Sequence, residues 1–202
     1  TNPQLKLPNY PSLKGNLATH EINSNRLTYK NVYPGISEQI EIIKGGLESS
    51  TIIEEKPSYI DELSPNEFVT FSHFIPLKKN WIIKDIEGNH INQNLRIQQF
   101  SIQLDGEDQT IYFGKITVFD HYLKKKEALQ LFPNLPADKI TKEQENQFKN
   151  NVLNLPYQLV FTNGGIEVLT EIPVSWLQNP SRSYPVTIDP TVTITYVDNY
   201  QT

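Results

Sequence analysis

Apolar and polar residues alternate along much of this chain in short runs, which is the pattern of half-buried β-strands. The runs are rich in β-branched and aromatic side chains, and Pro, Gly, Asn or Asp bounds them. Strands at spacings of about 8–12 residues indicate a β-sandwich or barrel rather than alternating βαβ units. The expected strands cover residues 39–43, 47–53, 68–75, 81–86, 97–104, 110–119, 157–161, 166–172 and 186–188.

Two glycine pairs separate neighbouring strands and predict β-hairpins. Gly45 and Gly46 form the first pair, and Gly164 and Gly165 follow Asn163 in the second. Both central positions of a type I′ turn need positive φ, which glycine adopts without steric cost. Two hairpins of this kind make antiparallel pairing the dominant architecture.

One stretch departs from the strand pattern. Thr141 begins a Thr-x-x-Gln capping box, and the sequence continues to about Val152 without Gly or Pro. We expect a single surface helix here, within a long insertion at about 122–155, and a second helical segment over 122–131. The predicted fold is therefore mainly β: an antiparallel β-sandwich-like domain with one inserted surface helix.

Composition narrows the function classes. The 202 residues suit one sizeable domain, and 37% hydrophobic with 20% charged residues is ordinary for a globular protein. The formal net charge of -5, with no basic stripe, argues against nucleic acid as a partner. No apolar run approaches the ~20 residues of a membrane helix, so we expect no membrane span.

Cysteine and methionine are both absent. Without cysteine there is no disulfide, no thiolate metal site and no cysteine nucleophile. Because even the first position lacks methionine, we expect a mature or excised piece of a longer product, with any targeting segment upstream. We expect no cofactor, since neither a phosphate-cradling glycine loop nor a Gly-x-Ser-x-Gly elbow occurs.

The carboxylates Asp105, Glu107 and Asp108 surround a glycine, and calcium prefers such oxygen-rich turns. The cluster nevertheless falls far short of a twelve-residue calcium loop, and Asp-Gly is an ordinary hairpin turn. None of the four histidines has the spacing of a zinc site. We therefore expect a turn here and no metal.

Two further groups of residues are candidates for chemistry. Asp120 and His121 could form an acid–base pair at a strand end, but no serine elbow accompanies them, so a hydrolase ranks last among our hypotheses. Trp81 and Trp176 could stack on a sugar, although aromatic residues more commonly serve as cross-strand core partners. His73, within a strand, is expected to face solvent or to make a satisfied polar contact.

The C-terminal stretch from Trp176 to Val192 contains two prolines that bracket a short strand. Pro185 and Pro190 each remove a backbone donor, which suits a sheet edge or a domain exit. Asp189, before the second proline, would end the strand in a turn. We expect this last strand to leave an unpaired edge that promotes association.

Four pieces of the chain form a series: residues 25–36, which include Pro34 and Gly35, then 45–48 with 52–53, then 76–81, and the closing 184–191. In this order they resemble a β-rich module of large secreted bacterial proteins that carry RHS/YD repeats, including polymorphic toxins and adhesin-like surface proteins. The residues Ser37, Glu38 and Gln39 depart from the Asp-Leu-x that commonly follows Pro-Gly-Ile/Val in that family, and the insertion from Lys124 is a second departure.

The resemblance implies a non-catalytic structural or capping module of a secreted or cell-surface protein. Its partners would be neighbouring repeat domains of the same or a cleaved polypeptide, together with export machinery. The composition is similar to that of Bacteroidetes proteins exported by type IX secretion. We expect an N-terminal extension at 1–16, the module at 17–192 and a linker or next element at 193–202. The alternative is a carbohydrate- or surface-binding module.

Overall fold

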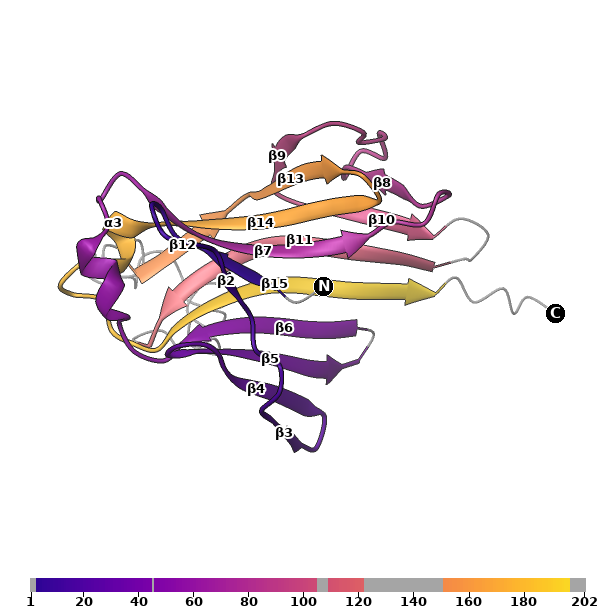
Figure 1. Ribbon diagram of the computed structural model, residues 1–202. Helices are drawn as coiled ribbons and strands as arrows, with labels where there is room; N and C mark the ends of the chain where they lie inside the picture. Colours follow the sequence, from indigo (N-terminus) through magenta and orange to yellow (C-terminus); the bar gives the residue numbers. More distant parts are fainter. Residues whose placement is uncertain (1–2, 45, 105–108, 122–150, 197–202) are drawn as a thin grey trace, which may run out of the picture.

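The computed structural model describes residues 3–44, 46–104, 109–121 and 151–196, and these form two antiparallel sheets packed face to face (Figure 1). The described helical elements are a short 3-10 turn, η1 (Ser58–Glu62), and one α-helical turn, α3 (Val174–Leu177). The predicted mainly β, sandwich-like architecture is confirmed.

The smaller sheet, sheet A, has six described strands. Their order across the sheet is β2 (Leu13–Lys14), β1 (Gln4–Lys6), β7 (Phe68–Pro76), β14 (Gly165–Pro173), β13 (Tyr157–Thr162) and β9 (Leu95–Ile97).

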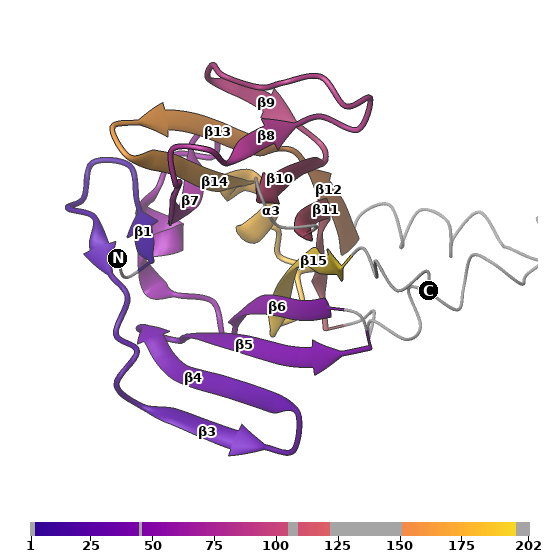
Figure 2. The same ribbon diagram turned by 90° about the vertical axis from the view of Figure 1, so that its right-hand side faces the viewer.

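The larger sheet, sheet B, has nine described strands. Eight run in the order β3 (His20–Asn23), β4 (Arg26–Tyr33), β5 (Ile36–Ile43), β6 (Gly46–Ile53), β15 (Val186–Tyr196), β11 (Gln109–Asp120), β10 (Phe100–Leu104) and β8 (Ile82–Lys84), and β12 (Val152–Leu155) also pairs with β11. Because sheet B is the wider of the two, β3, β4 and β5 project beyond sheet A (Figures 1 and 2). We call strands β3–β6 the wing.

Inward-facing apolar side chains from both sheets fill the core, as alternation along each strand requires. At its centre the Phe100 and Phe113 rings stack at 4.3 Å between centroids, and the Tyr157 ring meets Phe100 edge-on at 5.2 Å. The largest fully buried side chains are Tyr33, Phe71, Phe100, Leu5, Ile36, Ile53, Ile60, Ile102, Ile116, Leu159, Ile166 and Ile172.

Both predicted hairpins are present, but the second glycine of each pair has a different role from the one expected. Asn163 and Gly164 make the turn between β13 and β14, and Gly164 has φ +92°. Gly165 already belongs to β14, and a Cβ there would lie 2.3 Å from the Ile75 carbonyl oxygen. Gly46 likewise lies in β6, where a Cβ would lie 3.1 Å from Thr193 Cα. Close backbone approach, rather than positive φ, therefore requires glycine at these two positions.

The strand that carries the closing motif is central, and the expectation of a sheet edge was wrong. β15 pairs with β6 on one side and with β11 on the other, so its edges are covered. Pro190 lies opposite Ile116, beside a register shift in β11 between Phe113 and Ile116. Proline is tolerated inside a sheet at such a bulge, where the ladder is already interrupted. Asp189 therefore lies within a continuous strand rather than at its end.

The ends of the module and of the insertion also differ from the expected boundaries. In the segment expected as an extension, β1 pairs with β7 and buries Leu5 completely. The segment from Val152 to Leu155 is strand β12, not the end of a helical insertion, because Val152 pairs with Phe119. β15 continues to Tyr196, into the expected linker. The helical segment expected at 122–131 lies outside the described residues, and so does the helix expected from Thr141 except for its last two positions, 151 and 152.

Candidate functional site

The outer face of the wing is polar and carries cross-strand ion pairs. Arg26 Nη2 lies 2.8 Å from Glu41 Oε2, and Lys30 Nζ lies 2.7 Å from Glu21 Oε1. Exposed pairs of this kind contribute only about 0–1 kcal/mol each to stability, but they keep the face solvated. This is the solvent side of a one-sided antiparallel sheet.

The inner face of the wing is apolar and lies partly open to solvent. Ile42 is 63% exposed and Ile22 is 73% exposed, although both share the face that holds the core further along the sheet. One row of cross-strand neighbours passes from the open face into the core: Ile42, Leu47, Val192, Phe113 and Phe100. Its last member, Phe100, is 2% exposed. The inner face of sheet B therefore stays apolar along this row beyond the edge of sheet A.

A cleft of about 250 Å³ lies between the sheets next to the wing. Apolar side chains from both sheets form most of its walls, and a few polar groups converge on it, which is the usual make-up of a small-molecule site. Its lining includes Glu38, Ile40, Phe71, His73, Ile75, Phe113, Tyr157, Val168, Thr170, Ile188, Pro190 and Val192.

The titratable groups of the cleft are Glu38, His73 and Tyr157, and the uncharged polar residues of its lining are Gln39, Ser49, Ser50, Thr51 and Thr170. His73 Nε2 lies 3.5 Å from Glu38 Oε1, which is the polar contact that the sequence left open for this histidine. The hydroxyl of Tyr157 is buried and has no hydrogen-bond partner within the described part of the chain. Burial raises the pKa of Tyr157 above its ordinary value, so this phenol stays protonated and can donate a hydrogen bond.

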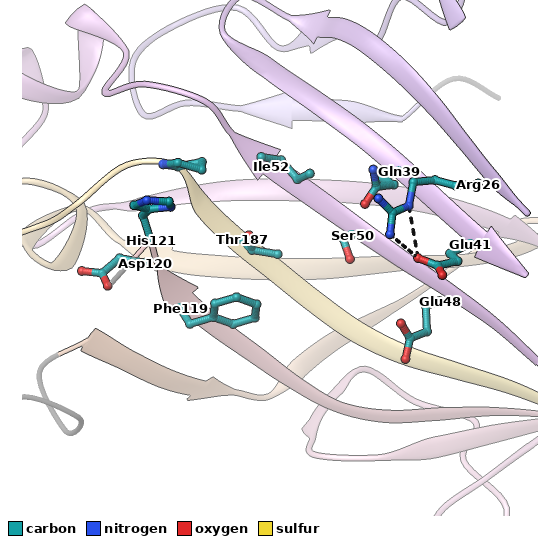
Figure 3. Close-up of a pocket in the computed structure, with 11 residues that line it drawn as sticks. Arg26, Gln39, Glu41, Glu48, Ser50, Ile52, Phe119, Asp120, His121 and Thr187 are labelled. Carbon is teal, nitrogen blue, oxygen red and sulfur yellow. Dashed lines mark hydrogen bonds and ion pairs between the residues drawn. The ribbon is translucent and has the colours of Figure 1, made fainter. Parts of the chain in front are cut away.

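A second depression, of about 270 Å³, lies on the outer face of sheet B (Figure 3). Arg26, Glu41 and Glu48 mark one end of it, and Asp120 and His121 mark the other (Figure 3). Glu41 and Glu48 are cross-strand partners, and Arg26 donates two hydrogen bonds to Glu41 Oε2, at 2.8 and 3.2 Å. The carboxylate pair and the histidine do not converge, so the groove contains no acid–base constellation.

The end of the sandwich opposite the open wing holds a buried charge cluster centred on Arg182. Its Nη1 donates to Asp120 Oδ2 at 3.0 Å, with 1% and 0% of the two side chains exposed. Nε donates to the Trp176 carbonyl at 3.2 Å, and the guanidinium lies 3.4 Å from the centroid of the Trp176 ring. Burial lowers the pKa of Arg182, while the hydrogen bond and charge of Asp120 act in the opposite direction.

This cluster determines where two of the predicted site residues lie. The carboxylate of Asp120 faces Arg182 and also accepts a hydrogen bond from the Ser183 N–H at 3.3 Å. His121 is exposed, and its backbone N–H donates to the Ser183 carbonyl. Asp120 is thus engaged by a buried cation rather than poised to orient the histidine.

The structure does not bring the two tryptophans together. Trp176 belongs to α3 and lies beneath Arg182. Trp81 precedes β8, packs partly against the core, and has Lys78 Nζ 5.6 Å from its ring centroid. α3 and β8 are at opposite ends of the molecule (Figure 1), so the pair forms no shared stacking platform.

The remaining predicted positions have simple outcomes. Pro34 and Gly35 form the turn between β4 and β5, where Gly35 has φ +72°. Pro185 precedes β15 directly. The acidic loop of Asp105, Glu107 and Asp108 lies outside the described residues, as does Gly45.

Among the described residues, no group of three or more His, Asp or Glu side chains could hold a metal ion. In the same residues, no helix has both the length and the apolar character to cross a membrane.

Sequence reasoning missed the two groups that matter most in the structure. Arg182 is the single cation between Trp176 and Val192, but its neighbours Asn179, Ser181 and Ser183 are polar, so no local pattern indicated its burial. Glu38 and Tyr157 carry no signal either, because a lone carboxylate or phenol in an alternating strand does not reveal which face it occupies.

Comparison with known proteins adds little. No protein-family model matches the chain. No curated protein matches it at a significant level. One solved structure, the Slr1438 protein from Synechocystis sp. PCC 6803, aligns with 90% of this chain and 66% of its own, at 9% identity and a TM-score of 0.36. The chain thus spans just under two thirds of that protein, and a likeness at this score carries no argument about fold or function.

Proposed function

We propose that this chain is a non-catalytic structural module of a large secreted or cell-surface protein of the RHS-repeat kind. In that role, the inner face of the wing packs against a neighbouring β-rich repeat module of the same polypeptide. The observation that carries the proposal is the contrast between the ion-paired outer face of the wing and its uncovered apolar inner face.

The energetic argument rests on Ile22 and Ile42. Covering a fully exposed isoleucine contributes about 1.5–3 kcal/mol, and these two side chains retain most of their exposure in the described structure. Leu27 and Ile40 connect them across the strands, since Ile22 pairs with Leu27 and Leu27 with Ile40. A contiguous exposed apolar patch rimmed by polar residues is typical of a protein interaction site.

The shape of the patch favours a β-rich partner. It is the inner face of a sheet, and a second sheet packs on such a face at about 10 Å with side chains interdigitated. The tip of the β5–β6 hairpin and the end of β15 lie at the same end of the molecule (Figure 1). The chain therefore leaves the described part beside the wing, where a following module would meet it.

Hydrogen exchange tests this proposal on two samples: the full native protein that contains this chain, recovered from culture medium and here called the parent, and the 202-residue chain alone. We expect slower amide exchange in β3, β4 and β5 in the parent than in the 202-residue chain alone, because packing covers that sheet. Equal exchange rates in the two samples would overturn the packing role. Recovery of the product only from within cells would overturn the secreted setting.

A matched pair of variants sharpens the test. The double substitution Ile22→Asp with Ile42→Asp places charge on the inner face, and we expect the module to separate from the rest of the parent after limited proteolysis. Ile86→Asp is the control, since Ile86 is equally apolar and 71% exposed but lies outside the wing. Retention of the module in both variants would contradict the proposal.

A further inference from the structure

The cleft between the sheets differs from the open wing because it is bounded on two sides and contains polar groups with unused capacity. Its volume of about 250 Å³ exceeds the ~150 Å³ of an engineered apolar cavity that admits benzene. A single ring or a short alkyl chain therefore fits between the walls. Ile40, Phe71 and Val168 supply the apolar contacts.

Tyr157 provides a hydrogen-bond donor in this cleft. The residue is 2% exposed, and its hydroxyl has no partner among the described residues. A buried hydroxyl without a partner is destabilising, so a bound acceptor would remove a penalty that the free protein carries.

Glu38 sets the charge preference of the cleft. Its side chain is 16% exposed, and its Oε1 makes no hydrogen bond within the described residues beyond the 3.5 Å contact with His73 Nε2. An ionised carboxylate accepts hydrogen bonds and repels another anion. A fatty acid would therefore bring its charge against Glu38, whereas a neutral hydroxyl group both donates and accepts.

From these three properties we infer that the cleft binds a small apolar alcohol, with its hydrocarbon part between the sheets and its hydroxyl group towards Tyr157 or Glu38. This inference goes beyond the packing role proposed above and rests on the cleft, which shares Ile40 of β5 with the packing face of the wing.

The test titrates the 202-residue chain with 1-octanol and, in parallel, with octanoate, while methyl resonances are followed by NMR. We expect saturable shifts at Ile40, Val168 and Ile188 with octanol, and affinity at least tenfold weaker for octanoate. Ile86, which is exposed and remote from the lining, is the internal control. Shifts that do not saturate, or that appear equally at Ile86, would overturn the site.

Two conservative variants separate the site from a purely structural role. Tyr157→Phe removes a net hydrogen bond of about 0.5–1.5 kcal/mol, so octanol affinity should fall about two- to tenfold while folding stability is unchanged or higher. Glu38→Gln should bring octanoate affinity close to that of octanol.

Unchanged octanol affinity in Tyr157→Phe, or continued rejection of octanoate by Glu38→Gln, would refute the assigned groups. Absence of octanol binding would refute the inference and would favour an apolar side chain of a neighbouring module as the occupant of the cleft. The hydrogen-exchange result for the wing would stand whatever the outcome of this titration.

Discussion

The end of the sandwich that holds Arg182 and the wing at its other side handle their surfaces in opposite ways. Around Arg182, a cation and a carboxylate are buried together as an ion pair, next to the half-buried ring of Trp176. In the wing, the ion-paired charges lie on the outer face, while Ile22 and Ile42 on the inner face are exposed to solvent. The Arg182 region buries charged groups, whose transfer out of water is unfavourable. The wing exposes apolar groups, whose transfer out of water is favourable.

The difference teaches which region satisfies its groups within the described structure. A buried ion pair is tolerated only if its hydrogen bonds are made internally, and Arg182 and Asp120 make theirs with each other and with nearby backbone groups. An exposed apolar face gains free energy whenever something covers it, so the wing is the region whose environment matters. The predictions below test this division, beginning with the largest expected effect.

Removal of one member of the buried pair should destabilise the chain most. Arg182→Ala leaves the Asp120 carboxylate buried without its cation, which typically costs about 3–5 kcal/mol. Lys30→Ala, which removes the cation of an exposed wing pair, should cost less than about 1 kcal/mol. Urea denaturation monitored by circular dichroism measures both. Similar midpoints for the two variants would erase the distinction between the regions.

The second prediction compares two isoleucines on one face of β5. Ile36 is fully buried and Ile42 is 63% exposed. Ile36→Ala should cost about 2–5 kcal/mol because it leaves a cavity in the core. Ile42→Ala in the isolated chain should change stability by no more than about 0.5 kcal/mol. A large loss from Ile42→Ala would mean that the wing already has a covering within this chain.

The third prediction uses the two strand glycines. A Cβ at Gly165 would lie 2.3 Å from a backbone oxygen, whereas one at Gly46 would lie 3.1 Å from the Thr193 backbone. Gly165→Ala should therefore cost about 1–3 kcal/mol through overpacking. Gly46→Ala should stay within about 1 kcal/mol, because the lower entropy of its unfolded chain offsets a small shift of β15. Thermal unfolding of both variants decides the order, and a reversed order would contradict tighter packing in sheet A.

The fourth prediction concerns alkaline pH. Burial raises the pKa of Tyr59 and of Tyr184 to about 12, above the ordinary value of 10.0. Their stabilising contribution is complete below pH 10 and is lost as the pH rises towards 12, since the unfolded state ionises first. The free energy of unfolding should fall as the pH rises from about 9 to about 11.5. Tyr59→Phe should make this pH dependence less steep. An unchanged slope in that variant would show that Tyr59 ionises freely in the folded chain.

Local patterns explain why much of the fold could be predicted. Strand alternation and the turn at Asn163 and Gly164 depend on residues that are neighbours in the chain, so the hairpins follow from sequence. The position of β15 does not, because two prolines suggested an edge and the bulge that accommodates Pro190 belongs to β11. Nor could the contact of Arg182 with Asp120 be foreseen, since no local pattern links residues so far apart.

The exposure of the wing was equally inaccessible. Ile36 and Ile42 have the same strand periodicity, and only the width of sheet A decides which of them is covered. For the same reason the cleft could not be predicted, because Glu38 and Tyr157 come from different sheets and meet only after the sheets pack.

The central place of β15 has a consequence for how the chain folds. The wing is a meander of neighbouring strands, and β10 and β11 form another, but these parts of sheet B join only through β15. Because that strand comes last among those described, the two parts of sheet B cannot pair through it until the residues of β15 are available. Pairings between residues so distant in sequence form slowly. A sheet that stays open until β15 pairs leaves its strands unfolded for longer, which would suit the exported setting proposed above.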